Sequence, residues 1–167
     1  MKKNKKNDLN IGELVVYPKH GVGEIKSISN IEISKLKIKC YIIQMEQSKL
    51  MIKVPLDKKN EVGLRKITSK KKIEEVFNIL KQKQKVRRIM WSRRAQEYDA
   101  KINSGDPIKM GEVIRDLFRK NNQPEQSYSE RQMFQVALER LAREVAAIEK
   151  TDYFNATEKI ENILHRK

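Results

Sequence analysis

The side chains of this sequence best suited to binding chemistry are concentrated in residues 81–94, KQKQKVRRIMWSRR. This stretch holds seven basic residues, no acidic residue and Trp91, which is the only Trp of the chain. Lys and Arg neutralise phosphates, and an aromatic ring stacks on bases or wedges between them. The combination therefore indicates nucleic-acid binding, although a basic run by itself is as often a solvated linker.

The sequence contains no set of residues typical of an enzyme. His20, His165 and the single Cys40 are too few for a tetrahedral metal centre, and one Cys excludes a disulfide framework. The glycine-containing turn at residues 21–23 lacks the third glycine and the Lys-Ser/Thr pair of a phosphate-binding loop. We therefore expect no catalytic residue, no bound metal and no cofactor.

The charge of the chain points to the same class of partner. Its 167 residues carry 37 Lys and Arg against 22 Asp and Glu, a formal net charge of +15. Residues 71–94 hold 9 basic and 2 acidic residues, whereas residues 95–167 are balanced, with 12 basic and 13 acidic. No apolar run is long enough to span a bilayer, and the Lys-rich start is not a secretory signal. We expect a cytoplasmic protein without membrane contact.

The elements that must hold these side chains change in kind near residue 68. Before it, short β-branched or alternating runs predict strands at 13–17, 24–29, 36–45, 50–54 and 64–67. In the third run, the even-numbered residues from Leu36 to Ile42 are expected on one face. Gly21 and Gly23 occupy turn positions typical of a positive φ. Five strands in so short a segment predict a small antiparallel barrel.

From residue 68 onward the apolar spacing is that of helices. Capping residues are expected at the starts of five helices: Thr68 or Ser69, Ser92, Asp106, Ser129 and Asn155. The fold class is therefore predicted to be α+β, with a small antiparallel β-barrel followed by an all-α helical bundle. The expected parts are a disordered basic tail at 1–10, a β domain at 11–67 and a helical domain at 68–167.

Four segments, in this order, resemble the CarD/CdnL family of bacterial transcription regulators. They are VVYPKHGVGEI at 15–25, MIKVPLDKKNEVGLR at 51–65, MWSRR at 90–94 and INSGDPIKMGEVIRDLFRK at 102–120. The first two also occur in the polymerase-binding module of the transcription-repair coupling ATPase, a far larger protein whose motor motifs this sequence lacks. The WSRR element is typical of the stand-alone factors, so it selects among these relatives.

The resemblance implies a Tudor-like β domain that binds the β subunit of RNA polymerase. It also implies a helical domain that contacts promoter DNA beside the −10 element. In the family, the Trp of WSRR enters the minor groove at the upstream edge of the transcription bubble and stabilises the open complex; here that residue is Trp91. The residues expected to hold DNA phosphates around it are Arg93, Arg94, Arg88, Arg87 and Lys85.

The resemblance places the contact with polymerase in the segment LMIKVP, at Lys53 together with Ile52, Val54 and Pro55. Family members have Arg where this chain has Lys53, and Lys does not form the bidentate pair with a carboxylate that Arg forms. They also often have a basic residue where Gln96 stands. The basic residues just upstream of Trp91 are the candidates to replace that contact.

Three functions remain open on the sequence. The first is a monomeric, non-enzymatic transcription factor that joins RNA polymerase to promoter double-stranded DNA and reaches the nucleoid through the polymerase. The second is a general RNA-binding protein whose basic linker contacts RNA. The third is an adaptor that binds only protein, with its charge serving solubility. Trp91 separates the first from the third, because an adaptor loses little on its removal, whereas a DNA wedge loses its function.

Overall fold

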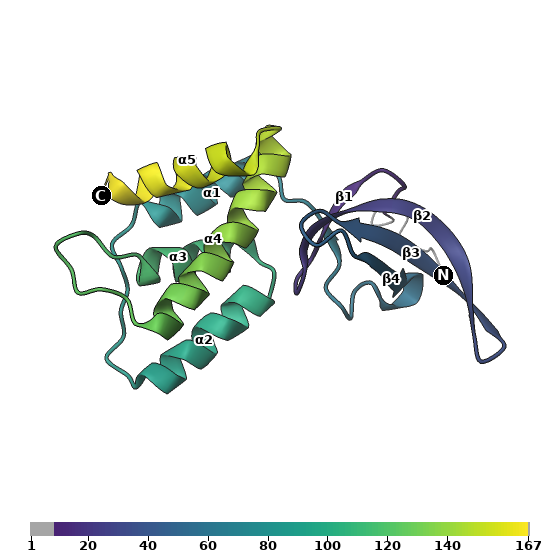
Figure 1. The fold of residues 1–167 in the computed structure, drawn as a ribbon, viewed down its shortest axis with the longest axis horizontal. Helices are drawn as coiled ribbons and strands as arrows, with labels where there is room; N and C mark the ends of the chain where they lie inside the picture. Colours follow the sequence, from purple (N-terminus) through teal and green to yellow (C-terminus); the bar gives the residue numbers. More distant parts are fainter. Residues whose placement is uncertain (1–8, 167) are drawn as a thin grey trace. The chain divides into compact units, whose positions relative to one another are not determined.

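The computed structural model describes residues 9–166, which divide into two compact units with the boundary between Ile67 and Thr68 (Figure 1). The first, here called the sheet unit, contains β1 (Leu14–Tyr17), β2 (Gly21–Ile33), β3 (Leu36–Met45), β4 (Met51–Pro55), the 3₁₀ helix η2 (Leu56–Lys58) and β5 (Arg65–Lys66). The second, the helical unit, contains α1 (Lys70–Leu80), α2 (Trp91–Asn103), α3 (Pro107–Leu117), α4 (Tyr128–Glu149) and α5 (Tyr153–His165). The expected α+β class is confirmed.

The five strands of the sheet unit form one antiparallel sheet in the order β4-β3-β2-β1-β5. The sheet is open, with β4 and β5 at its two edges, so the expected barrel is not confirmed. One face carries the core, which consists of Leu9, Val15, Ile25, Tyr41, Ile43, Met45, Val54 and Leu64. Residues 1–8 of the expected tail lie outside the described residues, whereas Leu9 is buried in this core.

The second strand is longer than its sequence pattern predicts, and its pairing register changes partway along. The pairing of β2 with β3 shifts between Ile25 and Ser27, which marks a β-bulge. As a result Ile25 and Ile28 both pack on the core although they lie three residues apart. A strict two-residue alternation cannot show this, and the expected strand covered only residues 24–29.

The odd-numbered residues of β3 face the core of the sheet unit, on the side of the strand opposite to the even-numbered set. The side chains that enter it are Tyr41, Ile43 and Met45, which have the opposite parity to the even-numbered set. The first residue of that set, Leu36, is 66% exposed because it lies at the far end of the β2–β3 hairpin. The second half of the strand is apolar at nearly every position, so alternation could not distinguish its two faces.

The two glycines of the first turn are needed for different reasons. Gly21 has a φ of +86°, as expected. Gly23 does not have a positive φ, so that expectation is wrong. A Cβ at Gly23 would lie 2.8 Å from Cγ2 of Ile43, and the close approach of β2 to β3 therefore excludes a larger residue there.

Two of the helix starts are where their capping residues predict. The side chain of Ser69 accepts a hydrogen bond from the backbone N–H of Lys72 at 3.2 Å and caps α1. The carboxylate of Asp106 accepts one from the backbone N–H of Ile108 at 2.9 Å and caps α3, with proline at the next position. Both starts are confirmed.

The expected starts of α4 and α5 are wrong, because an earlier residue caps each helix. The Ser127 hydroxyl, not that of Ser129, accepts from the backbone N–H of Glu130 at 3.2 Å. Asp152 caps α5 by accepting from the backbone N–H of Asn155 at 2.8 Å, so Asn155 itself lies in the first turn. In both cases two residues able to cap stand close together in the sequence.

The third helix lies at the centre of the helical unit and contacts α1, α2 and α4 (Figure 1). The apolar residues that recur at helical spacing in α1 and α3 are buried, including Ile73, Val76, Ile114 and Leu117. A buried carboxylate adds to this packing, since Glu144 of α4 accepts from the backbone N–H of Thr68 at 3.0 Å.

Candidate nucleic-acid interface

The basic residues expected to bind DNA lie in and after a segment that we call the strap, residues 81–90, which joins α1 to α2. The strap contains no regular secondary structure beyond turns and bends, yet it is hydrogen-bonded to α3 and the residues after it. The backbone N–H of Lys85 donates to Oδ1 of Asp116 at 3.0 Å, and the side-chain amide of Gln84 donates to the carbonyl of Phe118. The strap is therefore an ordered part of the helical unit.

An ion pair buried in α3 holds this attachment. Nε of Arg115 lies 2.8 Å from Oδ1 of Asp116, and the two residues are only 3% and 4% exposed. Arg115 also donates from Nη1 to Oε1 of Gln82 at 3.2 Å, which adds a third hydrogen bond to the strap. A buried charge pair is stable when its remaining polar atoms are also hydrogen-bonded, as they are here on the side that faces the strap.

Trp91 follows the strap directly and is the first residue of α2 (Trp91–Asn103). The expected cap at Ser92 is wrong, because Met90 occupies the capping position and makes no side-chain cap. Trp91 is half-buried, and its ring lies 6.3 Å from that of Tyr98 at an interplanar angle of 49°. Since Tyr98 is buried, the Trp91 ring is supported on one side and accessible on another.

Arg94 lies one turn further along α2 and supports both rings. Its guanidinium carbon is 5.4 Å from the centroid of the Trp91 ring and 5.8 Å from that of Tyr98, within the range of cation–π attraction. Its Nε and Nη2 are buried and have no hydrogen-bond partner among the described residues. This position is unlike that of a solvated phosphate contact, which stays a prediction for this residue.

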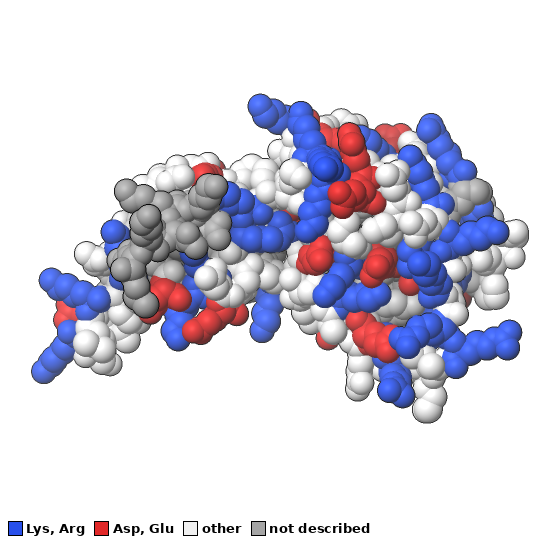
Figure 2. Space-filling view, turned by 180° about the vertical axis from the view of Figure 1, so that it is seen from behind, with Lys and Arg blue, Asp and Glu red and all other residues white. Residues whose placement is uncertain are grey.

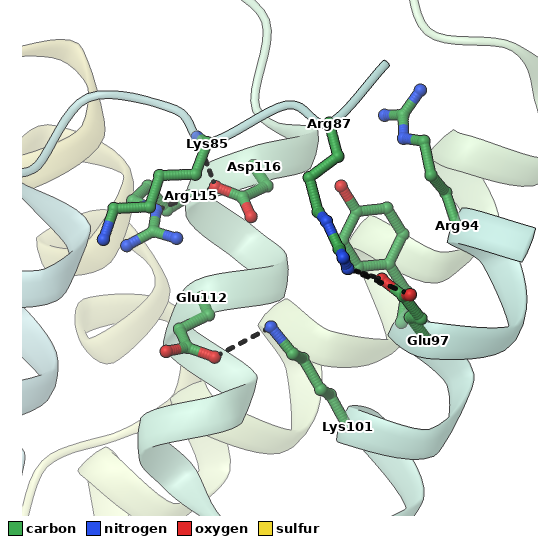
Figure 3. Close-up of a pocket in the computed structure, with 9 residues that line it drawn as sticks. Lys85, Arg87, Arg94, Glu97, Lys101, Glu112, Arg115 and Asp116 are labelled. Carbon is green, nitrogen blue, oxygen red and sulfur yellow. Dashed lines mark hydrogen bonds and ion pairs between the residues drawn. The ribbon is translucent and has the colours of Figure 1, made fainter. Parts of the chain in front are cut away.

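Arg87 of the strap lies against α2. Its Nη1 donates to both carboxylate oxygens of Glu97, at 3.0 and 2.9 Å (Figure 3). Lys85, Arg88 and Arg93 are exposed, and their side chains form no ion pair with a described residue. The expected phosphate-binding residues thus fall into two groups, of which only these three present an unpaired charge to solvent.

A pocket between the strap, α2 and α3 brings several of these residues together. Its walls include Lys85, Arg87 and Arg94 from the expected set (Figure 3). A second ion pair crosses it, with Nζ of Lys101 2.9 Å from Glu112. Figure 2 shows that acidic side chains are interspersed among the Lys and Arg side chains on one face of the helical unit. On that face the basic surface of the helical unit is interrupted by acidic side chains.

The far end of α2 is also fixed. Nη1 of Arg140 on α4 donates to the carbonyl of Ile102 at 3.4 Å. Burial lowers the pKa of the Arg140 guanidinium, and the nearby carboxylates of Asp99 and Glu139 oppose that effect. With the strap at its start and Arg140 near its end, α2 holds the Trp91 ring on a rigid element.

The residues expected to bind polymerase lie on β4, an edge strand of the sheet. Lys53 is exposed and available to a partner. Val54 is 2% exposed and belongs to the core, and Ile52 packs against that core. The side chain of Val54 therefore supports the strand from inside, and the other positions stay predictions. Exposed apolar residues also occur at the β2–β3 hairpin, where Ile33 is 55% exposed, a surface that the sequence analysis did not single out.

One carboxyl of the sheet unit has a shifted pKa. The backbone N–H and the side-chain amide of Asn10 each donate to Glu13 at 3.0 Å, and these bonds, with help from Lys66, lower the pKa of the Glu13 carboxyl. Among the described residues, no group of three or more His, Cys, Asp or Glu is arranged to hold a metal ion.

Comparison with known proteins covers both units. Residues 9–68 match the family model described as "CarD-like/TRCF RID domain", and residues 75–161 match "CarD, C-terminal domain". A protein of Bacillus subtilis (strain 168) described as "Putative transcription factor YdeB" is 30% identical over 138 residues. The matched region covers 83% of this chain and 90% of that protein.

Proposed function

The chain belongs to the CarD/CdnL family of transcription regulators, and on that premise we propose that it stabilises the open complex of RNA polymerase at promoters. In this proposal the sheet unit binds the β subunit of the polymerase. The helical unit places Trp91 in the minor groove at the upstream edge of the bubble, beside the −10 element. The protein acts as a monomer and reaches the nucleoid through the polymerase.

The observation that carries the proposal is the position of Trp91. Its ring is half-exposed at the very start of a helix, supported from behind by Tyr98 and Arg94. A wedge between base pairs must be apolar, accessible and rigid, because a mobile ring loses more conformational entropy on insertion. Exposed Arg88 and Arg93 lie three residues before it and two after it in the sequence, and in this proposal they bind phosphates near the inserted ring.

The wedge explains why binding favours the open state. An apolar ring interacts more strongly with a distorted, unstacked step than with an intact duplex, so the factor binds open complexes better than closed ones. A ligand shifts an equilibrium only by its difference in affinity for the two states. A tenfold shift requires about 1.4 kcal/mol, which one inserted aromatic ring can supply.

Two observations support a polymerase contact by the sheet unit. Its residues match the RID domain model, and Lys53 on β4 is exposed. An edge strand also offers unpaired main-chain groups to a partner. We place the contact there, on the side of the sheet opposite to β5 in strand order.

The lifetime of the open complex tests the proposal. The cognate RNA polymerase holoenzyme is bound to a promoter with an unstable bubble, with and without this protein, and then challenged with competitor. In parallel, binding to the isolated β subunit is measured by pull-down. A longer lifetime together with β-subunit binding is the expected result. Binding without a longer lifetime would reduce the protein to an adaptor, and loss of both would contradict the proposal and favour RNA binding.

A further inference from the structure

The ion pair between Arg87 and Glu97 changes what the basic strap can do. Both oxygens of Glu97 lie within 3.0 Å of Nη1 of Arg87, so this guanidinium is already paired in the free protein. Arg88, its neighbour in the sequence, forms no ion pair with a described residue. Of these two adjacent arginines, one is therefore ion-paired and the other is not.

We propose that Glu97 withholds Arg87 from DNA phosphates and thereby limits the affinity of the protein for DNA that is not held by polymerase. This inference rests on the proposed function, because it takes duplex DNA as the ligand of the strap. A cation contributes to DNA binding by neutralising a phosphate and releasing a counterion. Arg87 does this only after it leaves Glu97, and the carboxylate itself repels the phosphate.

The exposure of the pair makes it exchangeable. The side chains of Arg87 and Glu97 are 68% and 41% exposed, and ion pairs of this kind are weak and screened by salt. Releasing Arg87 from Glu97 therefore costs little free energy. A phosphate can displace the carboxylate when polymerase holds the DNA beside the strap and so raises the local concentration of phosphate. On free DNA no polymerase supplies that local concentration, so Glu97 competes with the DNA phosphates for Arg87.

The placement of Glu97 restricts its effect to one side chain of the expected set. Among the described residues, Glu97 forms an ion pair with Arg87, and the other nearby acids are engaged elsewhere. Asp116 pairs with Arg115, and Glu112 pairs with Lys101. Removal of the Glu97 charge is thus expected to free one cation of the strap, and the number of phosphates neutralised should rise by one.

The experiment is the salt dependence of binding of the full chain to a fluorescent DNA duplex, without polymerase. The variant Glu97→Gln should bind about two- to fivefold more tightly at low salt, the range released by one exposed ion pair. The slope of log affinity against log salt should steepen by about 0.9, the value for one additional phosphate. The double variant Arg87→Gln with Glu97→Gln, which lacks both partners of the pair, should lose the gain of Glu97→Gln.

The control is Glu161→Gln, which removes the same charge from an exposed position on α5. A gain from Glu97→Gln no larger than that of Glu161→Gln overturns the inference, as does a gain that survives in the double variant. None of these measurements contains polymerase, so their failure is distinct from failure of the open-complex assay.

Discussion

The backbone N–H of Lys85 and the carboxylate of Asp116 lie 3.0 Å apart, across 31 residues of the chain. The same oxygen of Asp116 accepts from Nε of Arg115 at 2.8 Å. One carboxylate thus joins the strap to α3, six residues before Trp91. The buried carboxylate of Asp116 thus helps to fix the position of Trp91, the proposed DNA wedge, without itself contacting DNA.

Asp116→Asn should destabilise the helical unit strongly. The substitution keeps an oxygen for Lys85 but leaves the buried Arg115 without its counter-charge, and breaking a buried pair costs about 3–5 kcal/mol. Urea unfolding followed by the fluorescence of Trp91 measures the loss. Glu112→Gln breaks a half-exposed pair with Lys101 and should cost about 1 kcal/mol or less. Equal losses in the two variants would show that the Asp116 pair is not a structural anchor.

Trp91→Ala should fold and still bind the β subunit, yet shorten the open-complex lifetime about tenfold relative to the wild-type protein, equivalent to ~1.4 kcal/mol. The ring is half-buried at the helix start and is not among the core residues, so its loss leaves the core in place. Phe154→Ala removes another aromatic ring of the helical unit, 81% exposed, and should leave the lifetime unchanged. An unfolded Trp91→Ala protein would instead identify Trp91 as a core residue.

Lys53→Glu should weaken binding to the polymerase β subunit about fivefold or more, because it places a negative charge on the proposed interface. Lys66→Glu makes the same change on β5, at the opposite edge of the sheet, where it replaces the exposed pair with Glu13 by a local repulsion. Quantitative pull-downs with the two variants locate the contact. Unchanged affinity for Lys53→Glu would move the interface away from β4.

Glu13 should contribute stability that depends on pH. Its carboxyl has a folded pKa below the ordinary value of 4.5, because the Asn10 hydrogen bonds favour the charged form. The contribution is therefore fully present above pH 4.5 and is lost as the pH falls through the lowered pKa. Urea unfolding of wild type and Glu13→Gln across this range should give stabilities that converge in acid. A difference that grows as the pH falls would reverse the sign of the linkage.

The sequence predicts the two-part organisation and the starts of α1 and α3, but not the starts of α2, α4 and α5. Asp106 is followed directly by a proline, which suits the first position of a helix, and α3 begins where expected. Ser127 and Ser129 both suit the start of α4, and only the packing of the helix decides between them. The bulge after Ile25 is equally invisible in the sequence, since it depends on the pairing with β3.

The residues of the candidate site can be predicted from the sequence, but which of its basic side chains are ion-paired cannot. The basic run and Trp91 stand together in the sequence, so their proximity requires no folding argument. The carboxylates that contact the strap lie outside it. Glu97 of α2 accepts from the Arg87 side chain, and Asp116 of α3 accepts from the backbone N–H of Lys85. Because those contacts depend on how the strap lies against the two helices, the sequence alone counts Arg87 as a free cation.

The hydrogen bond at Lys85 is made by the main chain. The route of the strap therefore does not depend on which side chain stands at this position. Any residue except proline supplies the N–H that Asp116 accepts, so substitutions at this position leave the route of the chain intact. The strap can then gain or lose positive charge by single mutations while delivering Trp91 to the same place. DNA affinity and wedge position are in this way open to separate selection.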